Sequence, residues 1–204
     1  MSSLTNNDPE LTAVNDILNS VGQIAVDTLD QTNPDVSIAL QTLRSVSREV
    51  QSEGWSFNFE YDVELPVDSN TKQVAIGDTY LFVDGTKDEY NYDLVVRNGK
   101  LYDLVKQTDE FEVSKLKVNR VLLQDFETLP HYVKDYITAR AATVASTRMV
   151  GDSTQYQFLK EREVEARSRL IENDCKVGDY SYFGYQNGQQ NYYTSYQPFR
   201  ALSR

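Results

Sequence analysis

The chain has 204 residues and a mass of 23.4 kDa, the size of one domain or of a domain with an insertion. Its 31 acidic and 20 basic residues give a net charge of −11, which excludes a general electrostatic attraction for nucleic-acid backbones or anionic lipid. One cysteine, Cys175, excludes an internal disulfide, and with the single histidine, His131, it is too little for a structural zinc site. We expect no cofactor, no membrane span and no signal peptide, because the sequence has no nucleotide-binding glycine loop, long apolar run or basic leader.

Two helices are predicted near the N-terminus, over residues 9–21 and 34–53. Each begins with a capping residue followed by proline, Asp8-Pro9 and Asn33-Pro34, a common start signal for a helix. Apolar residues then recur at helical spacing: Leu11, Val14, Leu18 and Val21 in the first, and Val36, Leu40, Leu43, Val46 and Val50 in the second. A two-helix hairpin is the simplest arrangement.

The hydrophobic period changes from helical to alternating after residue 54. Apolar residues occupy the odd positions of 55–65 and polar residues the even ones, which predicts a strand with one buried face. Asn98-Gly99 between two apolar runs predicts a hairpin whose turn residues adopt positive φ. The other predicted strands of this small, mostly antiparallel sheet are 74–76, 80–83, 92–97, 100–104 and 116–122.

Two more helices are predicted over residues 130–149 and 153–174. The apolar positions of the last helix are Phe158/Leu159, Val164, Ala166 and Leu170/Ile171. We expect its opposite face to carry the pairs Glu163–Arg167 and Glu165–Arg169, each spaced i,i+4. Cys175 is expected to follow the end of this helix as an inert thiol, and His131 to have a structural role in the first turn of the preceding helix.

The C-terminal segment has a distinct composition without a persistent period. Its aromatic residues are Tyr180, Tyr182, Phe183, Tyr185, Tyr192, Tyr193, Tyr196 and Phe199, separated by glycine, glutamine and asparagine. Such a segment is either an arm that binds a partner through its tyrosines or a disordered, sticky tail. We favour the arm, because exposed aromatic residues reduce solubility without a partner.

The order of these elements predicts an α+β fold: a four-helix bundle with an inserted, mostly antiparallel β-sheet and an extended aromatic C-terminal tail. We expect residues 1–54 to form an N-terminal helical hairpin and 55–123 the inserted sheet region. Residues 124–175 would supply the helical pair that completes the bundle, and 176–204 the tail arm.

Glu60, Asp62 and Glu64 alternate along the first strand, so we expect them on one face of it. Glycosidases use two carboxyl groups separated by about 5–9.5 Å, and neighbours on a strand face fall in that range. Alternating acidic residues are more often the solvated face of a sheet, which is the interpretation we prefer. A hydrolase remains the alternative.

Three segments resemble the tail tubular protein A family of short-tailed podoviruses. They are ELTAVNDIL at residues 10–18, GWSFN at 54–58 and LQDFETLP at 123–130, in matching order and spacing, and the resemblance covers about residues 10–175. It implies a helical bundle with an inserted β domain. It further implies a head-to-tail adaptor or gatekeeper in the virion tail, made in the host cytoplasm, that forms a dodecameric ring beneath the portal protein.

The resemblance also implies contacts with tail tubular protein B, which forms the nozzle, and with tail fibres around the junction. A ring needs two different complementary faces on each chain, and the net charges of −14 over residues 1–113 and +3 over 114–204 could supply part of that complementarity. We expect Glu60, Asp62 and Glu64 to contribute to an acidic lumen through which DNA passes without binding. We expect no catalysis; the alternatives are a virion-associated glycan or peptidoglycan hydrolase and a free regulatory binding protein.

Overall fold

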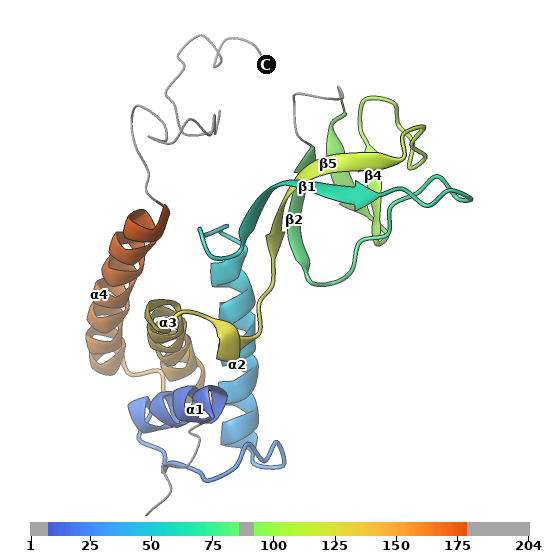
Figure 1. The fold of residues 1–204 in the computed structure, drawn as a ribbon. Helices are drawn as coiled ribbons and strands as arrows, with labels where there is room; N and C mark the ends of the chain where they lie inside the picture. Colours follow the sequence, from blue (N-terminus) through green and yellow to red (C-terminus); the bar gives the residue numbers. More distant parts are fainter. Residues whose placement is uncertain (1–7, 86–91, 179–204) are drawn as a thin grey trace, which may run out of the picture.

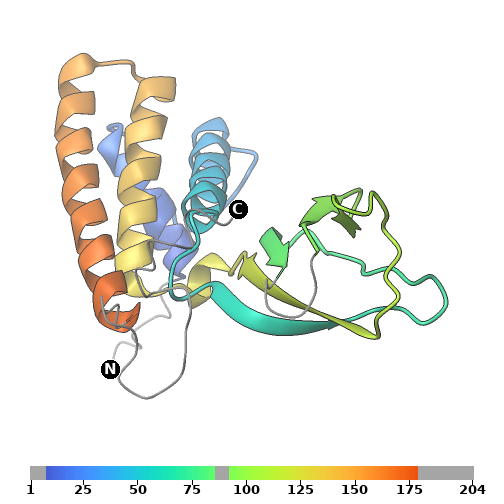
Figure 2. The same ribbon diagram turned by 90° about the horizontal axis from the view of Figure 1, so that it is seen from above.

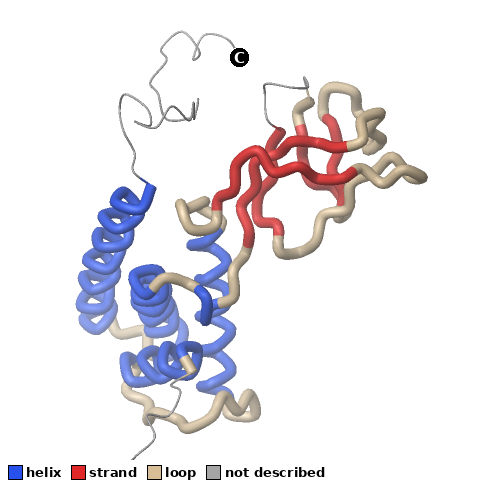
Figure 3. The backbone as a smooth tube through the Cα atoms, in the orientation of Figure 1, coloured by secondary structure: helices blue, strands red, loops and turns tan. Residues whose placement is uncertain are grey.

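The fold was described from a computed structural model, in which residues 8–85 and 92–178 are placed (Figure 1). The helices are α1 (Pro9–Ser20), α2 (Pro34–Gln51), the 3-10 helix η1 (Phe126–Thr128), α3 (His131–Met149) and α4 (Ser153–Gly178). The strands are β1 (Phe59–Pro66), β2 (Tyr80–Gly85), β3 (Leu94–Arg97), β4 (Lys100–Asp103) and β5 (Lys115–Leu122). Helices and strands occupy separate parts of the described chain, which confirms the predicted α+β class (Figure 3).

The first two helices begin at the expected capping residues. A side-chain oxygen of Asp8 accepts a hydrogen bond from the backbone N–H of Glu10 at 2.9 Å, and Asn33 accepts one from Asp35 at 3.0 Å. Each bond satisfies a backbone donor that the first helical turn leaves without a partner. These local signals therefore set where α1 and α2 start.

The four α-helices of the described chain share one apolar core, with α3 at its centre. Helix α3 contacts α1, α2 and α4, and α2 and α4 lie on its opposite sides (Figures 1 and 2). Buried alanines on α3, which include Ala139, Ala142 and Ala145, allow the neighbouring helices to approach closely. The long stripe of α2 packs here, as its period predicts.

The strands form two antiparallel sheets around a second, separate core. The larger sheet has the order β1-β5-β2, so β5 is central although it comes last in the chain. The β3-β4 hairpin turns at Asn98 and Gly99, with φ values of 50° and 72°, as predicted. Phe111, Leu101 and Leu116 are among the buried residues of this core.

Two buried amide side chains join the helical and β parts of the molecule. Gln51 at the end of α2 donates to the Gln124 carbonyl at 3.1 Å and accepts from the Gln124 N–H at 2.8 Å. Asn58 donates to the carbonyls of Gln51 and Leu122 at 2.9 and 3.0 Å, and accepts from the Trp55 N–H at 2.9 Å. We call Gln51 and Asn58 the amide clasp, because together they hold the entering and the leaving chain side by side.

Two predicted boundaries and one predicted strand are wrong. The first strand begins at Phe59 rather than at residue 55, because Asn58 folds the chain from Trp55 onward into a turn. Residues 74–76 form an isolated bridge from Ala75 to Lys100 instead of a strand. The last helix does not end at 174 but continues to Gly178, so Cys175 lies inside it and is exposed.

Candidate functional site: the groove at the helix–sheet junction

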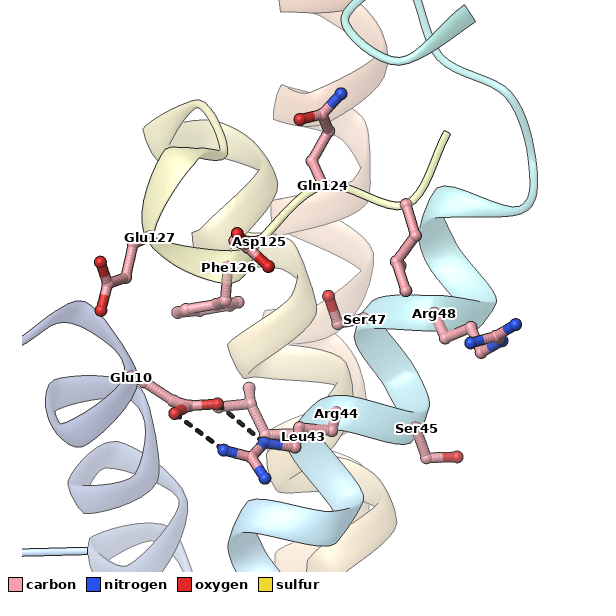
Figure 4. Close-up of a pocket in the computed structure, with 11 residues that line it drawn as sticks. Glu10, Leu43, Arg44, Ser45, Ser47, Arg48, Gln124, Asp125, Phe126 and Glu127 are labelled. Atoms are coloured by element: carbon pink, nitrogen blue, oxygen red, sulfur yellow. Dashed lines mark hydrogen bonds and ion pairs between the residues drawn. The ribbon is translucent and has the colours of Figure 1, made fainter. Parts of the chain in front are cut away.

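A groove of about 730 Å³ lies beside the amide clasp, where α1, α2 and the chain between β5 and α3 meet (Figure 4). Its lining residues are Glu10, Leu43, Arg44, Ser45, Ser47, Arg48, Leu123, Gln124, Asp125, Phe126 and Glu127. The groove thus brings together two of the three segments on which the resemblance rests, 10–18 and 123–130. These segments are more than a hundred residues apart in the chain.

An ion pair crosses one end of this groove, between α1 and α2. The guanidinium of Arg44 donates to both carboxylate oxygens of Glu10, with Nε–Oε1 at 3.0 Å and Nη2–Oε2 at 3.2 Å (Figure 4). The hydrogen bond to Glu10 raises the pKa of Arg44 above its ordinary value. Since the Arg44 side chain is 58% exposed, the pair orients the two helices more than it stabilises the fold.

Arg48 lies one helical turn further along α2 and has a different environment. Its guanidinium donates to the backbone carbonyl of Asp78 at 3.3 Å, and it forms no ion pair with the part of the chain that the structure describes. Arg48 therefore contributes a cation without an ion pair to the rim of the groove, and in Figure 4 its side chain points away from Asp125 and Glu127.

The chemistry of the groove is that of a binding surface. Leu43, Leu123 and Phe126 supply apolar area, and charged residues of both signs surround it. Its lining includes no histidine or cysteine, and Ser47 accepts a hydrogen bond from Gln51 at 3.0 Å rather than contacting a base. An apolar floor with a charged rim is suited to a polypeptide segment.

The three acidic residues of β1 do not share one face, and that expectation is wrong. The pairing of β1 with β5 shifts by one residue between Glu60 and Val63, because a β-bulge places two residues of β1 opposite Asn119. Asp62 lies in the bulge with a φ of 52°, and its N–H donates to Asn119 Oδ1 at 3.1 Å. Glu60 now pairs with Arg120 and Glu64 with Lys117 in the register, so the two glutamates point to opposite faces.

Ion pairs neutralise two of these three carboxylates. Arg120 holds Glu60 at 2.6 Å and Lys115 holds Glu64 at 2.8 Å. The hydrogen bond from Lys115, with the charge of the ammonium, lowers the pKa of Glu64 below its ordinary value. A glycosidase needs one carboxyl group kept protonated beside a second, and Glu60 and Glu64 do not form such a pair.

The structure also locates the remaining candidates. His131 is exposed in the first turn of α3 and lines a second hollow, of about 470 Å³, between α1, α3 and α4. The eight aromatic residues of the predicted arm, 180–199, lie outside the described residues, whereas the start of that predicted segment, 176–178, belongs to α4.

Residues 8–85 and 92–178 were compared with the requirements of a metal site and of a membrane-spanning helix by their side chains and helix lengths alone. In these ranges, groups of three or more histidine, cysteine or acidic side chains that could hold a metal ion do not occur. Among the helices in the same ranges, none combines the length and apolar character that a membrane crossing requires.

Sequence reasoning did not identify the amide clasp or the Glu10–Arg44 pair. Both are polar contacts between residues far apart in the chain, which periodicity does not reveal. A signal was available for the clasp: Asn58 and Gln124 fall inside the segments GWSFN and LQDFETLP that carry the resemblance.

The fold is a helical bundle with an inserted β part, and the groove lies where the two parts meet. The family model for tail tubular proteins matches residues 11–180, so the chain belongs to the tail tubular protein family. It is a structural component of a phage tail.

A comparison with curated proteins gives the same assignment. The chain is 30% identical over 158 residues to Tail tubular protein A of Klebsiella phage KP34. The match spans 76% of this chain and 81% of that protein. The resemblance seen in three short segments therefore extends over most of the sequence.

Proposed function

We propose that this protein is the head-to-tail adaptor of its virion. In this role copies of the chain form a ring, dodecameric by family resemblance, that joins the portal protein to the nozzle formed by tail tubular protein B, with tail fibres around the junction. The observation that carries the proposal is the family match over residues 11–180, which includes all the helices and strands of the described chain except the start of α1. The role is structural and involves no catalysis.

The contacts at the joint between the helical and β parts of the molecule favour an adaptor that must resist mechanical force. The amide clasp and the ion pair of Glu10 with Arg44 tie α1, α2 and the chain leaving β5 together within one small region. Asp174 of α4 adds a further tie, since Ser56 donates to it from its N–H at 2.9 Å and its hydroxyl at 2.6 Å. These contacts hold the helical and β parts in one relative orientation, which suits a connector between capsid and tail.

We further propose that the acidic part of the chain faces the DNA channel. Residues 1–113 carry a net charge of −14, which would repel phosphate and let DNA pass. Asp62 is the member of the acidic trio best placed to contribute, because it is exposed and Glu60 and Glu64 are engaged by Arg120 and Lys115. A ring whose lumen is basic would overturn this part of the proposal.

The tail arm is proposed to contact the portal or a neighbouring subunit through its eight aromatic residues. The test is co-assembly of the purified chain with the portal ring of the same phage, followed by mass measurement and electron microscopy. We expect a defined ring on the portal for the full chain. A chain without residues 179–204 should keep its circular dichroism spectrum and thermal unfolding but lose the complex.

A second variant keeps the length of the arm and replaces its eight aromatic residues with serine. It should fail to assemble as the truncated chain does, which would assign the effect to the aromatic side chains rather than to length. If the full chain forms no complex at any ratio or salt concentration, the adaptor proposal is wrong. If the truncated chain assembles as well as the full chain, the arm is not the contact.

The other two hypotheses receive less support. The hydrolase depended on carboxylates sharing a face of β1, and Glu60 and Glu64 point to opposite faces. A free regulatory protein does not fit a member of a tail protein family. We therefore propose neither.

A further inference from the structure

Helix α4 presents an exposed apolar row along one flank. Its buried residues are Glu163, Ala166, Leu170 and Asp174, which face the inside of the molecule. Val164 and Ile171 lie seven residues apart, so they share one flank of the helix, about 100° around from the buried residues, and they are 56% and 44% exposed. A hollow of about 530 Å³ beside Val164 is lined entirely by residues of α4, so the described chain leaves this face uncovered.

An acidic row runs beside the apolar one. Glu161, Glu165 and Glu172 follow each other at spacings of four and seven residues, which places them on one side of the helix. Glu172 is held by Lys176 at 2.8 Å. Glu161 and Glu165 are exposed and form no ion pair with the described residues. The outward face of α4 therefore combines apolar area with the two unpaired carboxylates, while the exposed Arg162 and Arg169 lie on the other flank, at the hollow between α1, α3 and α4.

The opposite edge of the bundle has the complementary character. Helix α2 lies across α3 from α4 (Figures 1 and 2), and its outward face carries Ile38, Ser45 and Arg48, all exposed. Arg48 forms no ion pair with the described residues, and it borders the groove with the apolar residues Leu43 and Phe126. This edge thus offers a positive charge beside apolar area.

We infer that the outward face of α4 packs against the α2 edge of a second copy of this chain. The inference rests on the proposed ring, and it names the surface through which the ring closes. A ring requires a heterologous contact, in which two different patches on opposite sides of each subunit meet. The α4 and α2 edges are opposite, and their unpaired charges have opposite signs, with Glu161 and Glu165 facing Arg48.

A charge swap tests the contact. The variant E161K/E165K should assemble on the portal ring about tenfold or more weakly than the wild type, because it places like charges opposite each other. Adding R48E should restore assembly to within about threefold of the wild type. The control E110K/E112K makes the same change in net charge at two exposed residues of the β part and should assemble normally. Subunits bound per portal ring are counted by native mass spectrometry.

The outcomes separate this inference from the proposed function. If the wild type forms no ring, the adaptor proposal itself is wrong. If the wild type forms a ring and E161K/E165K does so equally well, the α4 face is not the contact, and the adaptor proposal stands. If E161K/E165K fails and R48E does not rescue it, the α2 edge is not the surface that α4 meets, and the inference is overturned. Unchanged thermal unfolding of each variant shows that it is folded.

Cross-linking provides a second readout of the same contact. In a C175S background, V164C on α4 and S45C on α2 place single thiols on the two proposed faces. With a short bis-maleimide, the chain that carries both thiols should give a ladder of covalent multimers in the assembled ring. Chains with either thiol alone should give no ladder, since a heterologous contact does not bring identical positions together. A ladder in the single-thiol chains, or none in the double variant, would contradict the inference.

Discussion

Replacing Asn58 with alanine should weaken the joint between the helical and β parts of the molecule. The Asn58 side chain is 1% exposed and makes three hydrogen bonds, to the carbonyls of Gln51 and Leu122 and from the N–H of Trp55. Alanine removes all three and leaves backbone groups at the joint without their partners.

The expected loss follows from these contacts. A buried hydrogen bond contributes about 1 kcal/mol net, and a buried group left unpaired costs about as much or more. Three bonds therefore predict a loss of about 3 kcal/mol in the free energy of unfolding. For a chain of this size that corresponds to a decrease of about 6–12 °C in the unfolding temperature.

Urea unfolding measures this loss by two signals. Trp55, the single tryptophan, belongs to the joint and reports on it by fluorescence, while circular dichroism follows the helices. The control is Asn70→Ala, at an exposed asparagine, which should change stability by less than about 0.5 kcal/mol. A loss below about 1 kcal/mol for Asn58→Ala would refute the reasoning that the buried amide holds the joint.

Substitutions at two other positions test local contacts. Trp55 is partly buried and donates from its indole N–H to the Val50 carbonyl at 2.8 Å. Trp55→Phe should therefore lower the free energy of unfolding by about 1 kcal/mol and Trp55→Ala by about 2–3 kcal/mol, measured by thermal unfolding with circular dichroism. If both variants were as stable as the wild type, this prediction would be wrong. Lys115→Met should raise the pKa of Glu64 back toward its ordinary value, measured by NMR titration, because Lys115 is the main cause of its lowering. A carboxyl group whose pKa is lowered in the folded state stabilises the fold at pH values above its ordinary pKa, about 4.3 for glutamate, and this stabilisation is lost as the pH falls further. Lys115→Met should therefore destabilise the protein at pH 7 more than at pH 3. An unchanged pKa of Glu64 would refute the pairing.

The first strand shows how far a local pattern reaches. The alternation over residues 55–65 identified the strand, yet it did not contain the bulge at Asp62 that reverses which face each later residue occupies. Asn119, which accepts the Asp62 N–H, lies 57 residues away in the chain. The predicted grouping of Glu60 with Glu64 failed for that reason.

Helix α4 shows that a local pattern also does not determine which residues of a helix are buried. Its sequence has apolar residues on two sides, and the exposed face was expected to carry Glu163 paired with Arg167. In the structure Glu163 is buried, held by Arg140 of α3 at 3.1 Å and Lys160 at 2.7 Å, while Val164 is exposed. Arg167 instead pairs with Glu53, at 2.9 Å. Glu163 therefore lies on the same inward side of α4 as the core residues Ala166 and Leu170.

The sequence by itself determined the features whose causes are local: the helix starts at Asp8-Pro9 and Asn33-Pro34, the turn at Asn98-Gly99, and the α+β class. These depend on capping, backbone dihedral preference and hydrophobic period, which neighbouring residues supply. Only the tertiary structure decided the amide clasp, the groove beside it and the outward face of α4. Each of these requires polar or apolar groups that meet across long stretches of chain, and a pattern of neighbours carries no information about such partners.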